Sequence, residues 1–260
     1  MAKGSYFQKY KEDNKDSLPK ISHNIHLNDE QKRKFEEGSV ILIDKEPHWT
    51  SFDVVRKIRN NLKIKKVGHA GTLDPLATGL LIICTGKFTK KINEYMAAQK
   101  EYTGKITLGA VTPTYDLESE PQDFKSIDGI TEESILNYAQ NYKGEQWQKP
   151  PVFSAIKKAG TRLYELARRG EDVELEPRKI FIHNFKITNI NLPEIDFVIN
   201  CSTGTYIRSI AHDMGVALKT GAYLSNLRRT AIGDFKIDNA VKIDEWLSGL
   251  SQSKKDNLSQ

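Results

Sequence analysis

Cysteines are scarce in this sequence of 260 residues, and long apolar runs are missing. Its two cysteines, Cys84 and Cys201, lie far apart in apolar stretches without Cys-x-x-Cys spacing. We therefore expect two reduced, buried thiols, and neither a disulfide framework nor a zinc site. No apolar run approaches the roughly 20 residues of a membrane span, and the start lacks the apolar core of a signal peptide. These absences predict a cytoplasmic protein with no membrane partner.

Strong charge of one sign is also lacking, because the formal net charge is only +5. A polyanionic partner is permitted by this charge but not demanded. Hydrophobic residues make up 38% and charged residues 28%, which is ordinary for a globular chain, and the length allows a sizeable core. We read one domain at 26–250, preceded by a flexible polar arm at 1–25 and followed by a disordered tail at 251–260.

A glycine-rich run, Gly68–Leu81, is the most informative stretch that is present, and it leads directly into apolar residues typical of a buried strand. Glycine permits backbone conformations that other residues avoid, and a residue before proline is pushed towards extended geometry. The neighbours of Asp74 therefore set its conformation. A carboxylate held on a rigid loop at the mouth of a strand is a candidate nucleophile or general base. An isolated Asp-Pro pair would more simply predict a turn.

The hydrophobic periodicity predicts both helices and strands. Helices are expected from Thr50, at 89–97, 131–142 and 162–169, from about Thr205, and near Trp246; strands are expected at 39–44, after residue 80, and at 100–109, 178–190 and 197–201. Thr50 and Asp53 have the spacing of a capping box. Arg208 falls in the first turn of its helix, where the helix dipole disfavours a cation, so we expect an anion beside it.

Several motifs in order resemble those of the TruB family of tRNA pseudouridine synthases. The run Gly68–Leu81 matches G-H-A-G-T-L-D-P-x-A-T-G-L-L without a substitution. The other matches are Lys-x-Tyr-x-Gly at 100–104, Gly-x-x-Thr-x-Thr-x-Asp at 109–116, Gly-Thr-Tyr-Ile-Arg at 204–208, and the last motif at 227–235. In the first motif Lys45 matches, but Glu46 stands where proline is usual and His48 where glycine is usual. The resemblance covers about residues 38–248.

The resemblance implies an α+β fold, in which helices flank a mixed, largely antiparallel central sheet and an RNA-gripping insertion spans about 119–170. The segment 109–116 is polar, and we expect it to lie along the RNA groove. Bacterial relatives typically carry a PUA domain after the catalytic domain, and we expect none here. An isolated T-arm should then be modified nearly as well as whole tRNA.

The resemblance also assigns roles to individual residues. It implies that Asp74 is catalytic, and that the substrate-binding residues are Lys45, His69, Tyr102, Tyr206, Arg208 and Leu227. In this family Tyr102 would stack on the target base, Arg208 would hold Asp74 ionised, and Leu227 would exclude water. His69 would fill the space left by the flipped nucleotide. We expect contacts to the RNA backbone from Lys149, Lys157, Lys158 and Arg162, since cations neutralise phosphate.

The activity implied is the isomerisation of uridine to pseudouridine at position 55 in the T-arm of tRNA, with no metal and no cofactor. The partner would be tRNA alone, bound by a monomer with no obligate protein partner. Two alternatives stay open, namely the catalytic subunit of an RNA-guided synthase and a non-catalytic tRNA-binding chaperone. Attack on the sugar and addition to the base both remain possible routes for Asp74.

Overall fold

The computed structural model describes residues 25, 27–154, 157–158, 161–162 and 175–252. The arm expected at 1–25, apart from Ile25, and most of the tail expected at 251–260 lie outside these residues. Ile25 is buried in a hydrophobic core, so this residue is not part of a flexible arm. The described chain divides into two compact units: a middle unit, Glu101–Leu227, and a flanking unit made of the residues on either side of it.

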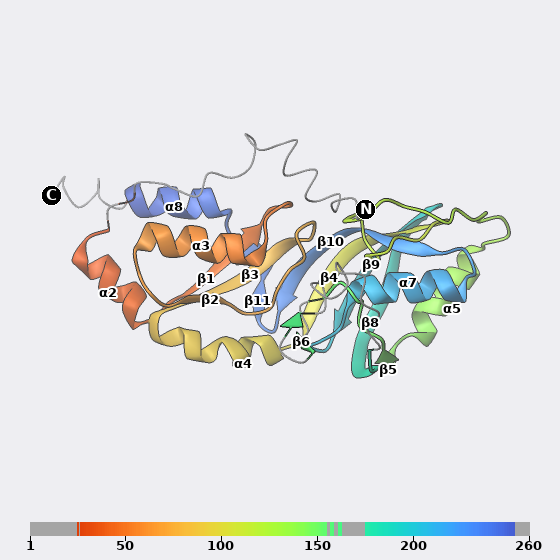
Figure 1. Cartoon of the computed structure of the whole chain (residues 1–260), viewed down its shortest axis with the longest axis horizontal. Helices are drawn as coiled ribbons and strands as arrows, with labels where there is room; N and C mark the ends of the chain where they lie inside the picture. Colours follow the sequence, from red (N-terminus) through yellow and green to blue (C-terminus); the bar gives the residue numbers. More distant parts are fainter. Residues whose placement is uncertain (1–24, 26, 155–156, 159–160, 163–174, 253–260) are drawn as a thin grey trace. The chain divides into compact units, whose positions relative to one another are not determined.

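Figure 1 shows the elements of both units. In the flanking unit they are α2 (Asp29–Glu37), β1 (Val40–Lys45), α3 (Ser51–Leu62), β2 (Val67–His69), β3 (Thr78–Thr85), η1 (Gly86–Lys91), α4 (Ile92–Ala97), β11 (Phe235–Lys236), η2 (Ile237–Asn239) and α8 (Ile243–Gln252). In the middle unit they are α5 (Glu132–Asn141), β5 (Gly144–Gln148), β6 (Lys157–Lys158), β7 (Thr161–Arg162), β8 (Arg178–Asn191), β9 (Glu194–Cys201) and α7 (Ile207–Ala217). Strands β4 (Lys100–Leu108) and β10 (Ala222–Ile232) have residues in both.

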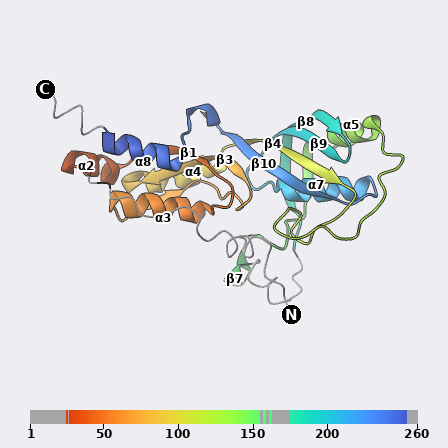
Figure 2. The ribbon, with the colours of Figure 1, turned by 90° about the horizontal axis from the view of Figure 1, so that it is seen from above.

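In the flanking unit, helices cover both faces of a small sheet ordered β1-β3-β10. Strand β3 pairs antiparallel with β1 and β2 and parallel with the end of β10. Alternate residues of β3 point to opposite faces, so Leu81 and Ile83 pack with α3 and α8 while Leu80 and Ile82 pack with α4. Figure 2 shows the same layers from above.

The helix α3 begins and packs as its sequence predicts. Thr50 and Asp53 form the expected capping box, with each side chain bonded to the backbone of the other residue. Val54, Val55, Ile58 and Leu62 are buried on one face. Buried Lys57 forms an ion pair with Asp244, which ties α3 to α8.

In the middle unit, the strand order is β10-β4-β9-β8-β5, and the long hairpin β8–β9 is antiparallel. Helices α5 and α7 contact each other through Tyr142, whose hydroxyl donates to Asp213 (2.9 Å), and α5 packs on β8 through the edge of the Phe185 ring. The helix expected from about Thr205 is α7, in which Ile207, Ile210, Ala211 and Met214 are buried. Together these pairings confirm the expected α+β class, with a largely antiparallel sheet.

Several elements differ from the sequence predictions. Patterning missed α2, because Phe35 is its only buried residue, and it missed β10. The insertion expected at about 119–170 contains the strand β5, which the periodicity did not predict. The helix expected at 162–169 is wrong at its first residue, since Arg162 pairs with Lys157 in the β6–β7 hairpin, and its other residues lie outside the described chain. Among the described residues, no helix is long and apolar enough to cross a membrane.

Candidate active site

Asp74 lies on the loop that joins β2 to β3 in the flanking unit. The two strands pair antiparallel from Val67 opposite Thr85 to His69 opposite Ile83, and the loop opens where this pairing ends. Gly79 closes the loop with φ 100°, and a Cβ atom there would come within 2.3 Å of the Arg229 carbonyl oxygen. Only glycine fits so close an approach, so the end of the loop is fixed by its contact with β10.

The backbone of the loop is bonded on both sides of Asp74. The amide of Leu73 donates to Ser51 Oγ (2.9 Å), and this hydroxyl lies 3.3 Å from the Leu73 carbonyl oxygen. The amide of Ala77 donates to the Asp74 carbonyl (3.1 Å), which closes a turn around Pro75. Since Ser51 is the first residue of α3, the helix start positions the loop directly.

Arg229 of β10 is a second support, and it is 1% exposed. Its Nε donates to the carbonyl of Leu80 (2.8 Å), and its Nη2 donates to that of Gly71 (3.1 Å). Its Nη1 reaches the carbonyl of Thr72 at 3.5 Å. One planar guanidinium thus joins the two ends of the loop, a geometry that lysine cannot reproduce.

Lys45, at the end of β1, is the third support and is also 1% exposed. Its Nζ donates to the carbonyls of Trp49 (2.7 Å), Glu46 (3.0 Å) and Pro75 (3.2 Å). Burial lowers the pKa of Lys45 to about 7, while the nearby charge of Asp74 acts in the opposite direction. The loop that carries Asp74 therefore rests on one permanent and one titratable buried cation.

His48, which stands where the TruB motif usually has glycine, keeps a glycine-like backbone. Its φ is 66°, in the left-handed region, and its amide donates to the Pro75 carbonyl (2.8 Å). Adopting this region costs a non-glycine residue about 1–2 kcal/mol. The departure from the motif thus leaves the turn intact, and the bond to the Asp74 loop comes from the backbone amide, which glycine would also supply.

His69 is the last residue of β2, at the start of the same loop. Burial lowers the pKa of His69 below its usual value, and the charge of Arg229 acts in the same direction. The ring is therefore neutral at neutral pH. A neutral ring suits the space-filling role expected of it better than a role as a cation.

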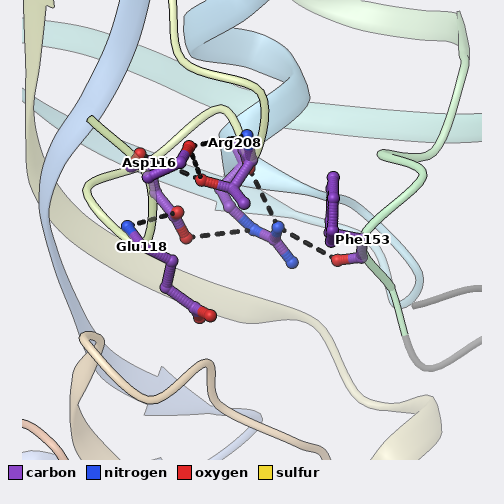
Figure 3. A network of polar contacts seen from close by, with 6 residues as sticks. Asp116, Glu118, Phe153 and Arg208 are labelled. Atoms are coloured by element: carbon purple, nitrogen blue, oxygen red, sulfur yellow. Dashed lines mark hydrogen bonds and ion pairs between the residues drawn. The ribbon is translucent and has the colours of Figure 1, made fainter. Parts of the chain in front are cut away.

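Arg208 lies in the first turn of α7 in the middle unit, where the sequence calls for a nearby anion. Figure 3 shows that anion to be Asp116, whose Oδ2 is 3.6 Å from Arg208 Nε. Arg208 Nη1 also donates to the carbonyls of Thr114 and Phe153, at 3.1 Å each. The Asp116 carboxylate is itself oriented by the amide of Glu118 (3.0 Å). The pairing of Arg208 with Asp74 remains a prediction.

The segment that ends at Asp116 was expected to lie along an RNA groove. Thr112, Thr114 and Asp116 are instead buried, at 2%, 6% and 5% exposure. Tyr115, between them, has φ 63° and stacks its ring on His212 with 4.0 Å between centroids. Because Arg208 and His212 are four residues apart on one face of α7, the segment docks on the helix and orients Arg208.

The remaining predicted residues of the middle unit lie on well-defined elements. Tyr206 precedes α7, and its amide and carbonyl bond both ends of the Gln148 side-chain amide (2.8 and 3.0 Å). Tyr102 on β4 and Leu227 on β10 are 9% and 8% exposed. Lys149 is exposed, and its carbonyl accepts a bond from Ser209 Oγ (2.9 Å). Lys157, Lys158 and Arg162 are placed by the pairing of β6 with β7.

Comparisons with known proteins agree with these motifs over most of the chain. Residues 59–207 match the family described as TruB family pseudouridylate synthase (N terminal domain), and residues 208–258 match the tRNA pseudouridylate synthase B C-terminal domain. The tRNA pseudouridine synthase B of Flavobacterium johnsoniae is 55% identical over 214 residues, which cover 80% of this chain and 93% of that protein. This chain belongs to the TruB family. The protein of the same name from Phocaeicola vulgatus is 48% identical over 82% of this chain and 94% of its own length.

Solved structures similar to this TruB-family chain come from archaeal and related assemblies. A chain of the archaeal box H/ACA sRNP Nop10-Cbf5 complex is 26% identical with a TM-score of 0.64, over 86% of this chain and 57% of that one. A chain of a Cbf5-Nop10-Gar1 complex is 28% identical with a TM-score of 0.68, over 91% of this chain and 64% of that one. This chain thus spans less than two thirds of the length of either of these two chains.

Sequence reasoning missed several residues that support the predicted site residues of this TruB-family chain. They are Ser51, Arg229 and Gln148, all of them buried polar residues. A signal for Arg229 was present, because Leu227, Arg229 and Ala231 alternate along a strand and so share a face with apolar neighbours. The other two are recognisable only from contacts between residues far apart in sequence.

Proposed function

We propose that this chain converts uridine to pseudouridine in tRNA, at position 55 of the T-arm. The observation that carries the proposal is the Asp74 loop, whose backbone is held by a glycine contact, a serine hydroxyl and two buried cations. A reaction that depends on a single carboxylate needs this pre-organisation, because the reaction is much slower when the nucleophile is displaced from its position. A glycoside hydrolase, in contrast, usually needs two carboxylates.

The reaction breaks the bond between N1 and C1′, rotates the uracil, and joins C5 to C1′. It is an isomerisation, since the proton lost from C5 is balanced by one gained at N1, and no electrons leave the substrate. Asp74 serves as the nucleophile, attacking either the sugar or the base. No oxidant, reductant or metal is required for this balance.

The other predicted site residues prepare the base for this reaction. The target uridine leaves the helical stack at a cost of a few kcal/mol, which stacking on Tyr102 offsets. His69 fills the space left by the nucleotide, and Arg208 keeps Asp74 ionised. Leu227 excludes water, which would otherwise divert the reaction to loss of the base. Lys45 and Tyr206 complete the substrate-binding set, the first through the loop and the second at the start of α7.

The same proposal covers the partners and the site of action. The enzyme acts in the cytoplasm as a monomer, with tRNA as its substrate and no obligate protein partner. Lys149, Lys157, Lys158 and Arg162 contact the RNA backbone from the insertion.

The test is to incubate purified protein alone with unmodified tRNA and to map pseudouridine along the product. Wild-type protein should yield pseudouridine at position 55, whereas Asp74→Asn should bind the same tRNA without multiple turnover. Product that forms only after a guide RNA is added would instead identify a guided subunit. Tight binding without product under either condition would identify a chaperone.

A further inference from the structure

An exposed basic face runs along α3 and into the loop after it. Phe52, Arg56 and Arg59 are spaced four and three residues apart in α3, so they share one face of the helix. Lys63 is the C-cap residue of α3, with a left-handed backbone, and Lys65 and Lys66 lie in the loop after it. All three lysines are exposed, while Arg56 and Arg59 are partly exposed. We call these six residues the α3 ridge.

Positive charge dominates the α3 ridge. From Val54 to Leu73 the sequence contains six lysines and arginines and no acidic residue. Lys57 is buried against Asp244, and Arg56 is bonded to the capping residue Asp53 (2.8 Å). Within the described part of the chain, no carboxylate forms a salt bridge with Arg59 or with Lys63, Lys65 and Lys66. As far as the described residues go, these four cations are thus available to an outside anion.

An exposed aromatic ring lies among these cations. Phe52 is 56% exposed, although a phenylalanine is usually buried when a core is within reach. The guanidinium carbon of Arg59 lies 6.0 Å from the centre of its ring, at the limit of a cation–π contact. Cations beside an exposed aromatic ring are the composition with which proteins bind single-stranded nucleic acid, through phosphate contacts and base stacking.

The ridge begins beside the candidate nucleophile, within one and the same unit. Ser51, which bonds the loop next to Asp74, immediately precedes Phe52. From Phe52 to Leu62, the last residue of α3, the helix rises by about 15 Å, at 1.5 Å per residue. An RNA strand that enters the Asp74 loop can therefore continue along α3 and meet a cation at each turn.

We infer that the α3 ridge binds the phosphate backbone of the substrate RNA next to the Asp74 loop, with Phe52 as a stacking surface for an unpaired base. This inference rests on the proposed function, because it takes RNA to be the substrate. It adds a second basic contact surface to the one on the insertion.

The test uses charge neutralisation in the Asp74→Asn background, which prevents turnover during binding. The ridge variant is Arg59→Gln, Lys63→Gln and Lys66→Gln, and the control is Lys87→Gln, Lys90→Gln and Lys236→Gln. The control removes the same charge from exposed positions of the same unit. The dissociation constant of a T-arm stem-loop is measured against salt, with thermal unfolding to confirm that both variants are folded.

The ridge variant should flatten the slope of log Kd against log salt by about 2–3, since each lost phosphate contact removes roughly 0.7–0.9. The control variant should change the slope by much less than the loss of one phosphate contact would. Phe52→Leu should weaken binding severalfold without changing the slope, because it removes stacking alone. Equal slopes for the ridge and control variants would overturn the inference.

The outcomes separate this inference from the proposed function. A ridge-dependent salt slope in a protein whose wild-type form makes no pseudouridine would sustain the ridge and reject the activity. Pseudouridine formed by the wild type, together with an unchanged slope in the ridge variant, would sustain the activity and reject the ridge.

Discussion

Lys45 and Arg229 both bind carbonyls of the Asp74 loop, but only one of them can lose its charge near neutral pH. The guanidinium of Arg229 stays charged at every accessible pH. The ammonium of Lys45 offers three N–H groups to three carbonyls, yet burial lowers its pKa to about 7. The loop should therefore keep the Arg229 contacts at all pH values, while the Lys45 contacts weaken in alkali.

Lys45 should make the stability of the protein depend on pH. Its pKa is 10.5 in the unfolded chain and about 7 in the folded chain, so between these values the unfolded chain binds more protons. Unfolding then becomes less favourable as pH rises through this window. Relative to Lys45→Met, the free energy of unfolding of the wild type should rise by roughly 2 kcal/mol between about pH 7 and about pH 9. Chemical denaturation of both proteins across this range measures the difference.

The exposed residue Lys90 provides the control for this measurement. The stability of Lys90→Met should follow that of the wild type in parallel at every pH. A constant difference between wild type and Lys45→Met would show that the buried amine does not titrate in this window.

Replacing Arg208 by lysine should lower the catalytic activity of the protein. Its guanidinium contacts Asp116, Thr114 and Phe153 through two different nitrogens, and lysine has only one. Arg208→Lys should lower kcat at least tenfold, or about 1.4 kcal/mol in barrier height, with little change in tRNA affinity. Arg178→Lys, at an exposed position of β8, is the matched control. Wild-type turnover in Arg208→Lys would remove this residue from the site.

At the scale of elements, the contact between the start of β3 and β10 fixes the Asp74 loop. Gly79→Ala places a Cβ atom 2.3 Å from the Arg229 carbonyl and strains a φ of 100°. We expect a loss of more than about 2 kcal/mol of stability, because backbone cannot move away cheaply. Gly249→Ala is the control: it lies in α8 with nothing within 4 Å, so it should be neutral or stabilising. Urea unfolding of the two variants decides the point.

Sequence reasoning recovered the elements whose signals are local. The capping box of α3, the buried stripe of α7 and the apolar run of β3 are each written in a few neighbouring residues. Strand β10 was missed because Ser225, Asn226 and Arg228 interrupt its apolar pattern. Arg229 is buried only because carbonyls of a distant loop satisfy it, and no local pattern encodes those partners.

The motifs located the candidate residues but not the framework that orients them. Asp74 was identified from its glycine-rich run, whereas its supports Ser51 and Arg229 come from a helix start and from a strand far along the chain. Likewise, Asp116 was identified as part of a polar pattern and assigned to the RNA groove, although it is buried beside Arg208. Polar residues look alike in sequence whether they face solvent or a buried cation.

At the scale of the whole molecule, RNA binding should depend on salt through the insertion. Neutralising Lys149, Lys157, Lys158 and Arg162 together should flatten the salt slope by up to about 3–4, at roughly 0.9 per phosphate contact. The same measurement on a variant that neutralises the three exposed lysines Lys87, Lys90 and Lys236 controls for net charge, with the change in slope compared per charge removed. If the insertion and the α3 ridge bind separate phosphates, the losses of RNA-binding free energy in the two variants should add in the combined variant, within about 0.5 kcal/mol. An unchanged slope would place the RNA elsewhere.

The division of the chain into two units has a consequence for how the protein unfolds. Boundaries between compact units usually fall in exposed linkers, but here the chain leaves the flanking unit between Lys100 and Glu101 of β4 and returns between Leu227 and Arg228 of β10. Both boundaries therefore lie inside strands whose amides are bonded in a ladder. At neither boundary does an unpaired linker separate the residues of one unit from those of the other. Amide hydrogens near the two boundaries should exchange only through global opening, and calorimetry should record one transition.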